Sequence, residues 1–409
     1  MKLIINRILS RFPLSNMRNV KLFYLIGGGM SFWLVEAVWY FYWSKLASFS
    51  QIGTIFAVLT LVWIFLEIPT GAIADMFGRK KSTIIGAFFL SLGSISMVAA
   101  TNFWYLIIGG LLQNIGRAFI SGSLEALVYD DLKKNNLEES YDDVIAAQTK
   151  IKYVAYALAT LAGGFLYLVY FRLPHLLTAV VDILVFSLTF FLIEIQYAKP
   201  PVQNFSNYIK QNLEGFKQLA KKELRPFIFL IISFETIFFL YDWGLSKASM
   251  AVNFGYNSAG QGIIYTIMAL VSAYLVGKVV YIRDRIGDYK GVILLCILLG
   301  LGFVLSAFPW GYFGVLVLLL IELTGAMSGP WISTIVNKHT NSQDRATTLS
   351  SLEFVSKLPF IFLVFISGSQ IENHTINRLH FSIGVSLIIL ASIYLFVKKR
   401  LRWTISSLP

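Results

Sequence analysis

Between two long apolar runs, the chain reads Gly71-Ala-Ile-Ala-Asp75-Met-Phe-Gly78-Arg79-Lys80-Lys81. The glycines permit a sharp turn and a close approach between the flanking helices. Three basic residues follow the turn directly, and basic residues beside apolar spans stay on the cytoplasmic side of a membrane. The stretch therefore predicts a charged cytoplasmic turn between two membrane helices, and it orients the chain.

The composition indicates a chain that is solvated mostly by lipid. Hydrophobic residues make up 56% of its 409 residues and charged residues 14%, whereas about a quarter of a soluble protein is charged. The net charge is +12, but the basic residues lie in short segments beside apolar runs, as membrane topology requires. We therefore expect a multi-pass protein in the lipid bilayer of the cell membrane, with no nucleic-acid partner.

Several other classes of function find no support in the residues. The single cysteine, Cys296, lies in an apolar run and rules out a disulfide framework or a cysteine-based metal site. The four histidines do not form a metal-ligand cluster, and there is no Gly-x-x-x-x-Gly-Lys-Ser/Thr loop for ATP. No nucleophile and base stand at a catalytic spacing. We expect no enzyme activity, no cofactor and no metal site.

A membrane-crossing helix needs about 20 mostly apolar residues. The sequence contains twelve candidates, at 21–44, 51–74, 82–100, 103–129, 144–168, 174–195, 226–250, 258–282, 290–308, 311–336, 346–369 and 378–397. We therefore expect an all-α membrane protein with 12 transmembrane helices. The expected parts are a cytoplasmic amphipathic arm at 1–20, six-helix halves at 21–195 and 226–397, a cytoplasmic linker helix at 196–225, and a cytoplasmic tail at 398–409.

The distribution of Lys and Arg predicts the orientation. If the termini are cytoplasmic, the inner segments hold nearly all the basic residues outside the spans, and the outer segments hold Lys45, Arg172 and Arg378. A bias of this kind places both termini in the cytoplasm.

The two groups of six spans look like repeats. Asp75-x-x-Gly78 follows the second span, and Asp284-x-x-Gly287 follows the eighth, although the second copy lacks the Arg-Lys pair. The first copy, in its Gly-x-x-x-Asp-x-x-Gly-Arg-Lys pattern, resembles the signature loop between helices two and three of the major facilitator superfamily. That resemblance implies two pseudo-symmetric six-helix halves.

The resemblance also implies a conformational latch on the inner face. Asp75 would face the N-terminus of span eleven, where the helix dipole favours negative charge. Arg79 would pair with an acid at the inner end of span four, for which we choose Asp130. Such a latch is worth about 1–2 kcal/mol. The alternative is that the basic residues only set topology. The predicted latch comprises Gly71, Asp75, Gly78, Arg79, Lys80 and Asp130.

Ionisable residues inside a bilayer are costly and are functional candidates by default. The resemblance implies that spans one, four, seven and ten line a central cavity. The deeply placed charges on those spans are Glu36, Arg117, Glu125, Glu235, Asp242 and Glu322. Asp182 on span six has no evident partner and stays unassigned. Glu353 and Lys357, spaced i, i+4, are expected to neutralise each other.

Helical spacing on span one places Trp33, Glu36, Trp39 and Tyr40 on one face. A carboxylate flanked by aromatic rings suits a lipophilic cation. A low-dielectric cavity also disfavours the ionised carboxylate, so the same group can bind a proton. The alternatives are an interfacial belt for Trp39 and Tyr40, and a structural ion pair of Arg117 with Glu36 or Glu322. Lys247 is a possible partner of Asp242.

The sites resemble those of the drug/proton antiporters of the superfamily. This implies proton-coupled efflux of amphipathic, cationic small molecules by alternating access, as in multidrug resistance. We expect a monomer whose partners are a small-molecule substrate, protons and the bilayer. The alternative is uptake or facilitated transport of a zwitterionic or anionic solute, with Arg117 and Lys247 holding its carboxylate.

Overall fold

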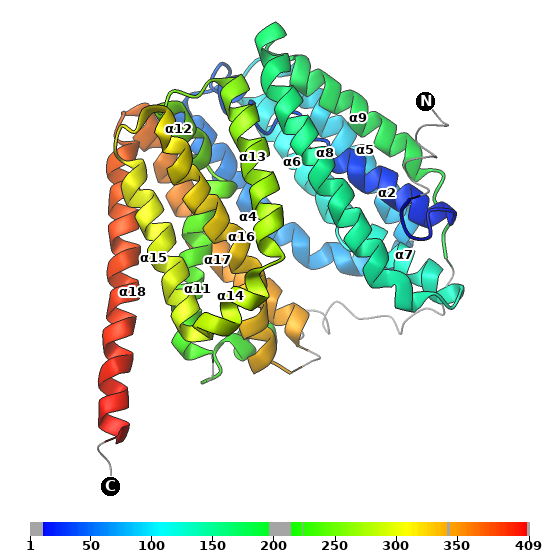
Figure 1. Ribbon diagram of the computed structural model, residues 1–409. Coiled ribbons are helices and arrows are strands. Elements are labelled where there is room, and N and C mark those ends of the chain that lie inside the picture. Colours follow the sequence, from blue (N-terminus) through cyan, green and yellow to red (C-terminus); the bar gives the residue numbers. More distant parts are fainter. Residues whose placement is uncertain (1–10, 196–213, 223, 342–343, 407–409) are drawn as a thin grey trace. The chain divides into compact units, whose positions relative to one another are not determined.

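The computed structural model describes residues 11–195, 214–222, 224–341 and 344–406, with the backbone alone at 67–77, 346 and 397–406. Within these ranges the chain is helical and contains no strand (Figure 1). The all-α fold class is therefore confirmed for the described residues. Residues 1–10 of the arm expected at 1–20, residues 196–213 and 223 of the linker helix expected at 196–225, and the surroundings of Gly71 and of the Asp75 side chain lie outside this description.

The helices follow one another with short connections. The first group is α2 (Arg18–Ser31), α3 (Trp39–Trp43), α4 (Phe49–Phe77), α5 (Arg79–Ala99), α6 (Phe103–Ile120), α7 (Ser123–Lys134), α8 (Tyr141–Val169) and α9 (Leu173–Thr189). The second group is α11 (Arg225–Asp242), α12 (Ser246–Asn253), α13 (Ser258–Val276), α14 (Val279–Ile286), α15 (Asp288–Ser306), α16 (Val315–His339), α17 (Arg345–Glu372) and α18 (Ile376–Ser406).

Nine helices of the described part are long and apolar enough to cross a membrane, and the bent pair α11 and α12 makes a tenth if it is one span. The chain is thus a multi-pass membrane protein. The shorter apolar helix α9 falls just below the length of a full span. The total of twelve spans in two halves stays a prediction. α18 continues to Ser406, past residue 397, where the sequence predicts the tail to begin.

The chain forms two compact units. The first is drawn from the described parts of Met1–Ala47, Val58–Ser206 and Ser258–Ile267, and the second from those of Ser48–Ala57, Asn207–Asn257 and Met268–Pro409. The N-terminal turns of α4 therefore belong to the second unit. The N-terminal turns of α13 belong to the first unit. Each unit is described by itself below.

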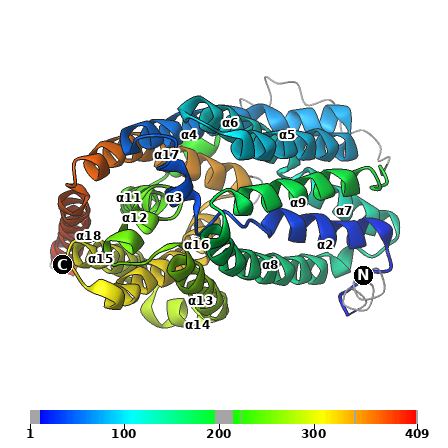
Figure 2. The ribbon, with the colours of Figure 1, turned by 90° about the horizontal axis from the view of Figure 1, so that it is seen from above.

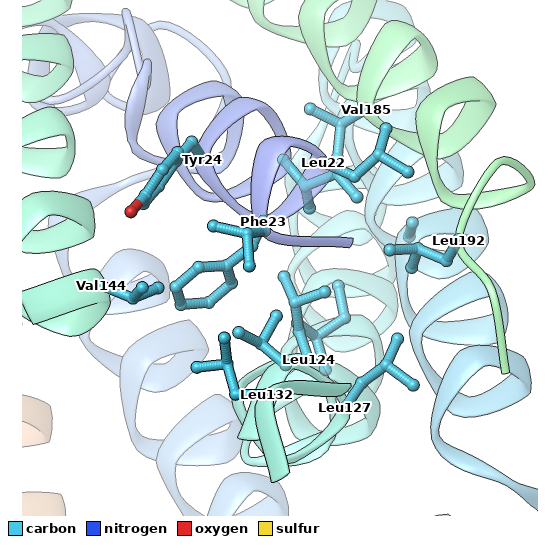
Figure 3. Close-up of a cluster of buried hydrophobic side chains, with 14 of the residues drawn as sticks. Leu22, Phe23, Tyr24, Leu124, Leu127, Leu132, Val144, Val185 and Leu192 are labelled. Atoms are coloured by element: carbon cyan, nitrogen blue, oxygen red, sulfur yellow. The ribbon is translucent and has the colours of Figure 1, made fainter. Parts of the chain in front are cut away.

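In the first unit, α2 and α9 lie side by side between α5 and α8 (Figure 2). The core lies where α2, α7, α8 and α9 meet. Figure 3 shows this cluster, with Leu22, Phe23, Tyr24, Leu124, Leu127, Leu132, Val144, Val185 and Leu192 among its members. Lipid tails are as apolar as these side chains, so close van der Waals packing between the helices stabilises the cluster inside a bilayer. In the second unit, α15 packs between α16 and α18, and α11 packs against α15 and α17 (Figure 1).

The first predicted span is broken rather than continuous. α2 ends at Ser31, α3 begins at Trp39, and residues 32–38 between them are not helical. Val35 and Val38 in this break are buried, and irregular backbone is tolerated at membrane depth where protein covers it. Gly163 of α8 permits the close approach, because a Cβ at Gly163 would lie 1.8 Å from the carbonyl oxygen of Leu34.

The break corrects one expectation from the sequence. Trp33 and Glu36 lie in the non-helical segment, whereas Trp39 and Tyr40 lie on α3, so the four residues do not share one helical face. Hydrophobicity alone could not reveal this, because an apolar run reads the same whether its helix is continuous or interrupted. The apolar run predicted at 226–250 is not one straight helix either, since α11 and α12 are bent by 57° at a short break.

Candidate functional site

The turn between α4 and α5 brings a predicted pair of residues together. Gly78 has a φ of +98°, which glycine adopts without strain, and it directly precedes α5. Arg79, the first residue of α5, forms an ion pair with Asp130 of α7. The same guanidinium donates a hydrogen bond to the carbonyl oxygen of Ala126. Arg79 therefore ties the start of α5 to α7 within the first unit.

Sequence reasoning missed a third member of this turn, Glu194, which follows α9. Its carboxylate oxygens accept hydrogen bonds from the backbone N–H groups of Arg79 at 3.2 Å and Lys80 at 3.0 Å. These are unpaired donors at a helix N-terminus, where the macrodipole also favours negative charge. A Cβ at Gly78 would lie 3.0 Å from the same carboxylate. Glu194 is thus an N-terminal cap supplied from a distant segment.

The second unit contains a turn of the same backbone shape with the charges reversed. Gly287 has a φ of +82° and directly precedes α15. The first residue of α15 is Asp288, and its carboxylate pairs with Lys338 near the end of α16, with Nζ and Oδ2 2.8 Å apart. Arg283 lies 4.0 Å from the other oxygen of Asp288. In the first unit α5 begins with the cation Arg79, whereas in the second unit α15 begins with the anion Asp288.

Arg117, on α6, is the centre of a charged cluster in the first unit. Its guanidinium lies over the ring of Trp33, 5.1 Å from the ring centroid. The charges of Asp182 and Glu36 both act on Arg117. The cluster joins α6 and α9 to the break between α2 and α3. Three of the predicted site residues, Arg117, Glu36 and Trp33, therefore belong to this cluster.

Asp182, on α9, was noticed in the sequence but could not be assigned. Ser94 of α5 donates a hydrogen bond to its Oδ2, and Gln113 of α6 donates to Ser94 Oγ at 3.1 Å. A chain of polar groups therefore holds this carboxylate in place. Because the contact depends on α9 packing against α5, spacing along the sequence could not have found it.

A second cluster lies at the bend between α11 and α12. The ammonium of Lys247 is 3.2 Å from Asp242 at the end of α11 and 3.0 Å from Glu322 of α16. It also lies 5.6 Å from the centroid of the Tyr241 ring. The side chain of Lys247 is 7% exposed, while those of Asp242 and Glu322 are 33% and 18% exposed. One buried cation is therefore shared between two carboxylates, of which Asp242 is the more accessible.

A third cluster connects α11 with α17. Lys357 pairs with Glu353 at 2.5 Å, and its ammonium lies 5.8 Å from the centroid of the Phe239 ring. The charge of Glu353 also acts on Glu235 of α11. Glu353 and Lys357 are thus in contact, as the i, i+4 spacing predicts, but they also belong to the surroundings of Glu235.

The three clusters have the same composition of two carboxylates and one basic group. If all groups were ionised, each cluster would carry a net charge of −1. A net negative charge in low-dielectric surroundings is costly, so a cluster of this composition suits uptake of a proton or of another cation. In the described part of the chain, no group of three His, Cys, Asp or Glu side chains is arranged to hold a metal ion.

The other predicted site residues lie apart from these clusters. The rings of Trp39 and Tyr40 pack edge to face with centroids 5.8 Å apart, and Trp39 packs likewise against Trp43 at 5.7 Å. Glu125 pairs with Lys152 at 3.7 Å, and about half of each side chain is exposed. Glu125, in the first turn of α7, is therefore paired with a cation of α8.

A family model described as the Major Facilitator Superfamily matches residues 22–364. Multidrug resistance protein 2 of Bacillus subtilis (strain 168) is 23% identical, over 61% of this chain and 62% of the relative. An uncharacterized transporter of Buchnera aphidicola subsp. Schizaphis graminum is 36% identical, over 21% of each chain. The match thus spans less than two thirds of the length of either relative.

Among solved structures, the nucleoside transporter NupG is similar with a TM-score of 0.73 and 16% identity, covering 93% of this chain and 98% of that one. An autoinhibited peptide transporter of the POT family gives a TM-score of 0.74 with 10% identity, covering 94% of this chain and 97% of that one. At these identities, the similarity establishes the fold.

Proposed function

The chain belongs to the Major Facilitator Superfamily, and from this premise we propose that it is a secondary active transporter that exports amphipathic cations in exchange for protons. The family makes it a membrane transporter of a small-molecule substrate. The proposal adds the direction, the coupling ion and the class of substrate. The observation that carries it is the repeated composition of the charged clusters, in which two carboxylates share one basic group.

A surplus carboxylate in low-dielectric surroundings must be neutralised by a proton or by a cation. The two ligands then compete for one group, because binding of either removes the negative charge that attracts the other. A transporter that carries the cation in one direction and the proton in the other needs this competition. Three clusters with a surplus carboxylate therefore support antiport better than they support simple diffusion of a neutral solute.

In the second unit, Asp242 is the group that we propose to exchange its partner. Its side chain is the more exposed of the two carboxylates around Lys247. Glu322 would continue to hold Lys247 while a substrate cation or a proton binds Asp242. The ring of Tyr241 supplies a face that already holds an ammonium at cation–π distance.

In the first unit, we propose the corresponding role for Glu36. Trp33 binds the guanidinium of Arg117 through its ring, so this aromatic face accepts a cation. Asp182 is held by Ser94 and would keep Arg117 neutralised when Glu36 binds another ligand. Glu36 lies in the break at 32–38, and non-helical segments at membrane depth commonly line ligand sites in transporters.

The orientation and the latch belong to the same proposal. We propose that both termini are cytoplasmic, that the chain acts as a monomer in the cell membrane, and that the turn around Gly78 is part of an alternating-access latch. The ion pair of Arg79 with Asp130 supports the latch, since it ties two helices at the turn. The name of the relative Multidrug resistance protein 2 supports efflux of drug-like cations.

A second candidate is uptake of a zwitterionic or anionic solute, bound through Arg117 and Lys247. The burial of Lys247 favours a role for its charge. Against this reading, an anion would have to compete with the carboxylates that already surround each cation.

The test uses purified protein in liposomes with an acidic interior and a dye that reports the internal pH. Addition of a lipophilic cation should release protons from liposomes that contain the wild type. Asp242→Asn should remove this release, and so should Glu36→Gln combined with Glu235→Gln. Glu125→Gln is the matched control, because this carboxylate is half exposed and already paired. If the Glu36 and Glu235 double variant keeps the wild-type release and its pH dependence, the exchange of protons and cations at these carboxylates is wrong.

A further inference from the structure

A stripe of aromatic and basic side chains runs along the outer face of α13 and α14. It consists of Tyr274 on α13, Lys278 in the short break at 277–278, and Tyr281 and Arg285 on α14. All four are exposed, Tyr274 by 68% and Tyr281 by 59%. One turn earlier, Leu270 continues the same face with an apolar side chain that is 55% exposed. The stripe therefore changes from apolar to aromatic to basic along its length.

The two cations of the stripe are held by aromatic rings rather than by carboxylates. The ammonium of Lys278 lies 4.9 Å from the centroid of Tyr274, and the guanidinium of Arg285 lies 4.2 Å from that of Tyr281. Within the described part of the chain, neither cation has a carboxylate within 4 Å. The neighbouring acids are already paired elsewhere, Asp284 with Arg283 at 3.0 Å and Asp288 with Lys338. The stripe thus presents two positive charges without local counterions.

The boundary between α13 and α14 shows which side of these helices faces away from the protein. α13 ends at Val276 and α14 begins at Val279, and Val279 is buried at 1% exposure. Burial of Val279 anchors the start of α14 on the protein side, while Lys278 and Tyr281 stay on the outside. Two cations seven residues apart on a helix are separated by about 10 Å along its axis, which suits two adjacent lipid headgroups better than a single small ion.

We propose that this stripe is a binding site for the headgroups of anionic phospholipids. Tyrosine rings are enriched at the depth of the headgroups, where one end of the ring is apolar and the other is wet. Basic residues beside a membrane span attract anionic lipids. Leu270 lies towards the acyl chains, the tyrosines lie at the boundary, and the cations reach the phosphates. In the orientation proposed above, the site faces the cytoplasmic leaflet.

The choice of an anionic lipid rests on charge complementarity. A zwitterionic headgroup brings its own cation, so it gains little from two unneutralised positive charges. Each basic residue near an anionic surface strengthens binding about five-fold. Loss of both Lys278 and Arg285 should therefore weaken binding to an anionic membrane surface roughly 25-fold, and in neutral detergent it should weaken binding of an anionic lipid more than that of a zwitterionic lipid.

The experiment measures binding of short-chain phosphatidylglycerol and phosphatidylcholine to the purified full-length protein in neutral detergent. The wild type should prefer phosphatidylglycerol. Lys278→Gln with Arg285→Gln should remove the preference, whereas Lys290→Gln should change it by less than about two-fold. Lys290 is the matched control, because it is exposed at the start of α15 and has no ring contact in the described structure. Equal losses in the two variants, or a retained preference in the double variant, would overturn the proposal.

A second variant separates binding from folding. Tyr281→Leu keeps both charges and the apolar surface but removes the ring beneath Arg285, so the lipid preference should fall by an intermediate amount. Inorganic phosphate is added as a competitor. Displacement of phosphatidylglycerol by millimolar phosphate alone would show an anion site without a lipid component and would also overturn the proposal. None of these readouts depends on transport, so they are independent of the proposed function.

Discussion

Replacement of Lys247 by methionine removes the central cation of the cluster at the bend between α11 and α12. Methionine nearly preserves the length and the apolar stem of lysine, so the change is chiefly one of charge. Asp242 and Glu322 would then face each other without the ammonium that now lies 3.2 Å and 3.0 Å from them. Unless one of the two carboxylates binds a proton, their negative charges repel each other.

Loss of one partner from a buried ion pair costs about 3–5 kcal/mol. The value at Lys247 should lie near the lower end, about 3 kcal/mol, because Asp242 is one third exposed. For a domain of 150–250 residues, each kcal/mol lowers Tm by roughly 2–4 °C, so we expect a drop of roughly 6–12 °C. The drop should be larger at pH 8 than at pH 5, since protonation of a carboxylate relieves the unpaired charge and requires more free energy as pH rises.

The chain provides its own probe for this measurement. Cys296 is the single cysteine of the sequence, and it is buried in α15, within the second unit. At pH 8, a dye that becomes fluorescent on reaction with a thiol therefore reports unfolding of the unit that contains Lys247; at pH 5, where the thiol is protonated and reacts slowly, the loss of helical circular dichroism is followed. Lys217→Met serves as the control, because Lys217 pairs with Glu214 on the surface and its side chain is 73% exposed.

The control should lose at most about 1 kcal/mol, as surface ion pairs do. Glu322→Gln added to Lys247→Met should recover part of the stability, because one of the two unpaired charges is removed. If Lys247→Met unfolds at the same temperature as Lys217→Met at pH 8, then Lys247 does not hold these carboxylates, and the exchange mechanism proposed for Asp242 loses its structural basis.

Three further outcomes are expected from thermal unfolding. Gly368→Ala should lower Tm by several degrees, because its Cβ would lie 2.3 Å from a backbone carbonyl oxygen of α4, whereas Gly329→Ala meets nothing within 4 Å and should be neutral; equal effects would contradict the packing. Lys338→Asp should destabilise the second turn by placing two carboxylates together, and Asp288→Lys added to it should restore most of the loss; failure of the double variant to recover would show that the pair is incidental. Gly78→Ala, in the first unit, should cost about 1–3 kcal/mol, because alanine is strained at a φ of +98°; the loss is followed by helical circular dichroism, since Cys296 reports on the second unit, and a variant as stable as the wild type would exclude the positive φ.

The sequence led to two of the observed ion pairs by different routes. For Arg79, the resemblance of its turn to the superfamily's signature loop implied an acid at the inner end of span four, and Asp130 was the acid chosen there. Lys247 and Asp242 are five residues apart, so spacing alone allowed that pair to be considered.

The remaining contacts depend on which helices are neighbours. Glu194 reaches the start of α5 from beyond α9, and Asp182 meets Ser94 through the packing of α9 on α5. No periodicity in the sequence encodes either contact. The break at 32–38 was missed for a different reason, because the energetic cost of its irregular backbone is offset by burial against α8, which hydropathy does not describe.

The opposite polarity of the two turns bears on how the halves of the chain relate by descent. If both turns come from one duplicated segment, then one ion pair was inverted after duplication. A single charge reversal in Arg79–Asp130 or in Asp288–Lys338 would have placed like charges against each other, so the inversion required two linked changes or a neutral intermediate. The halves are consequently no longer exchangeable parts. A chimaera that carried the first turn in both halves would set an arginine against Lys338 and would need a second substitution to be tolerated.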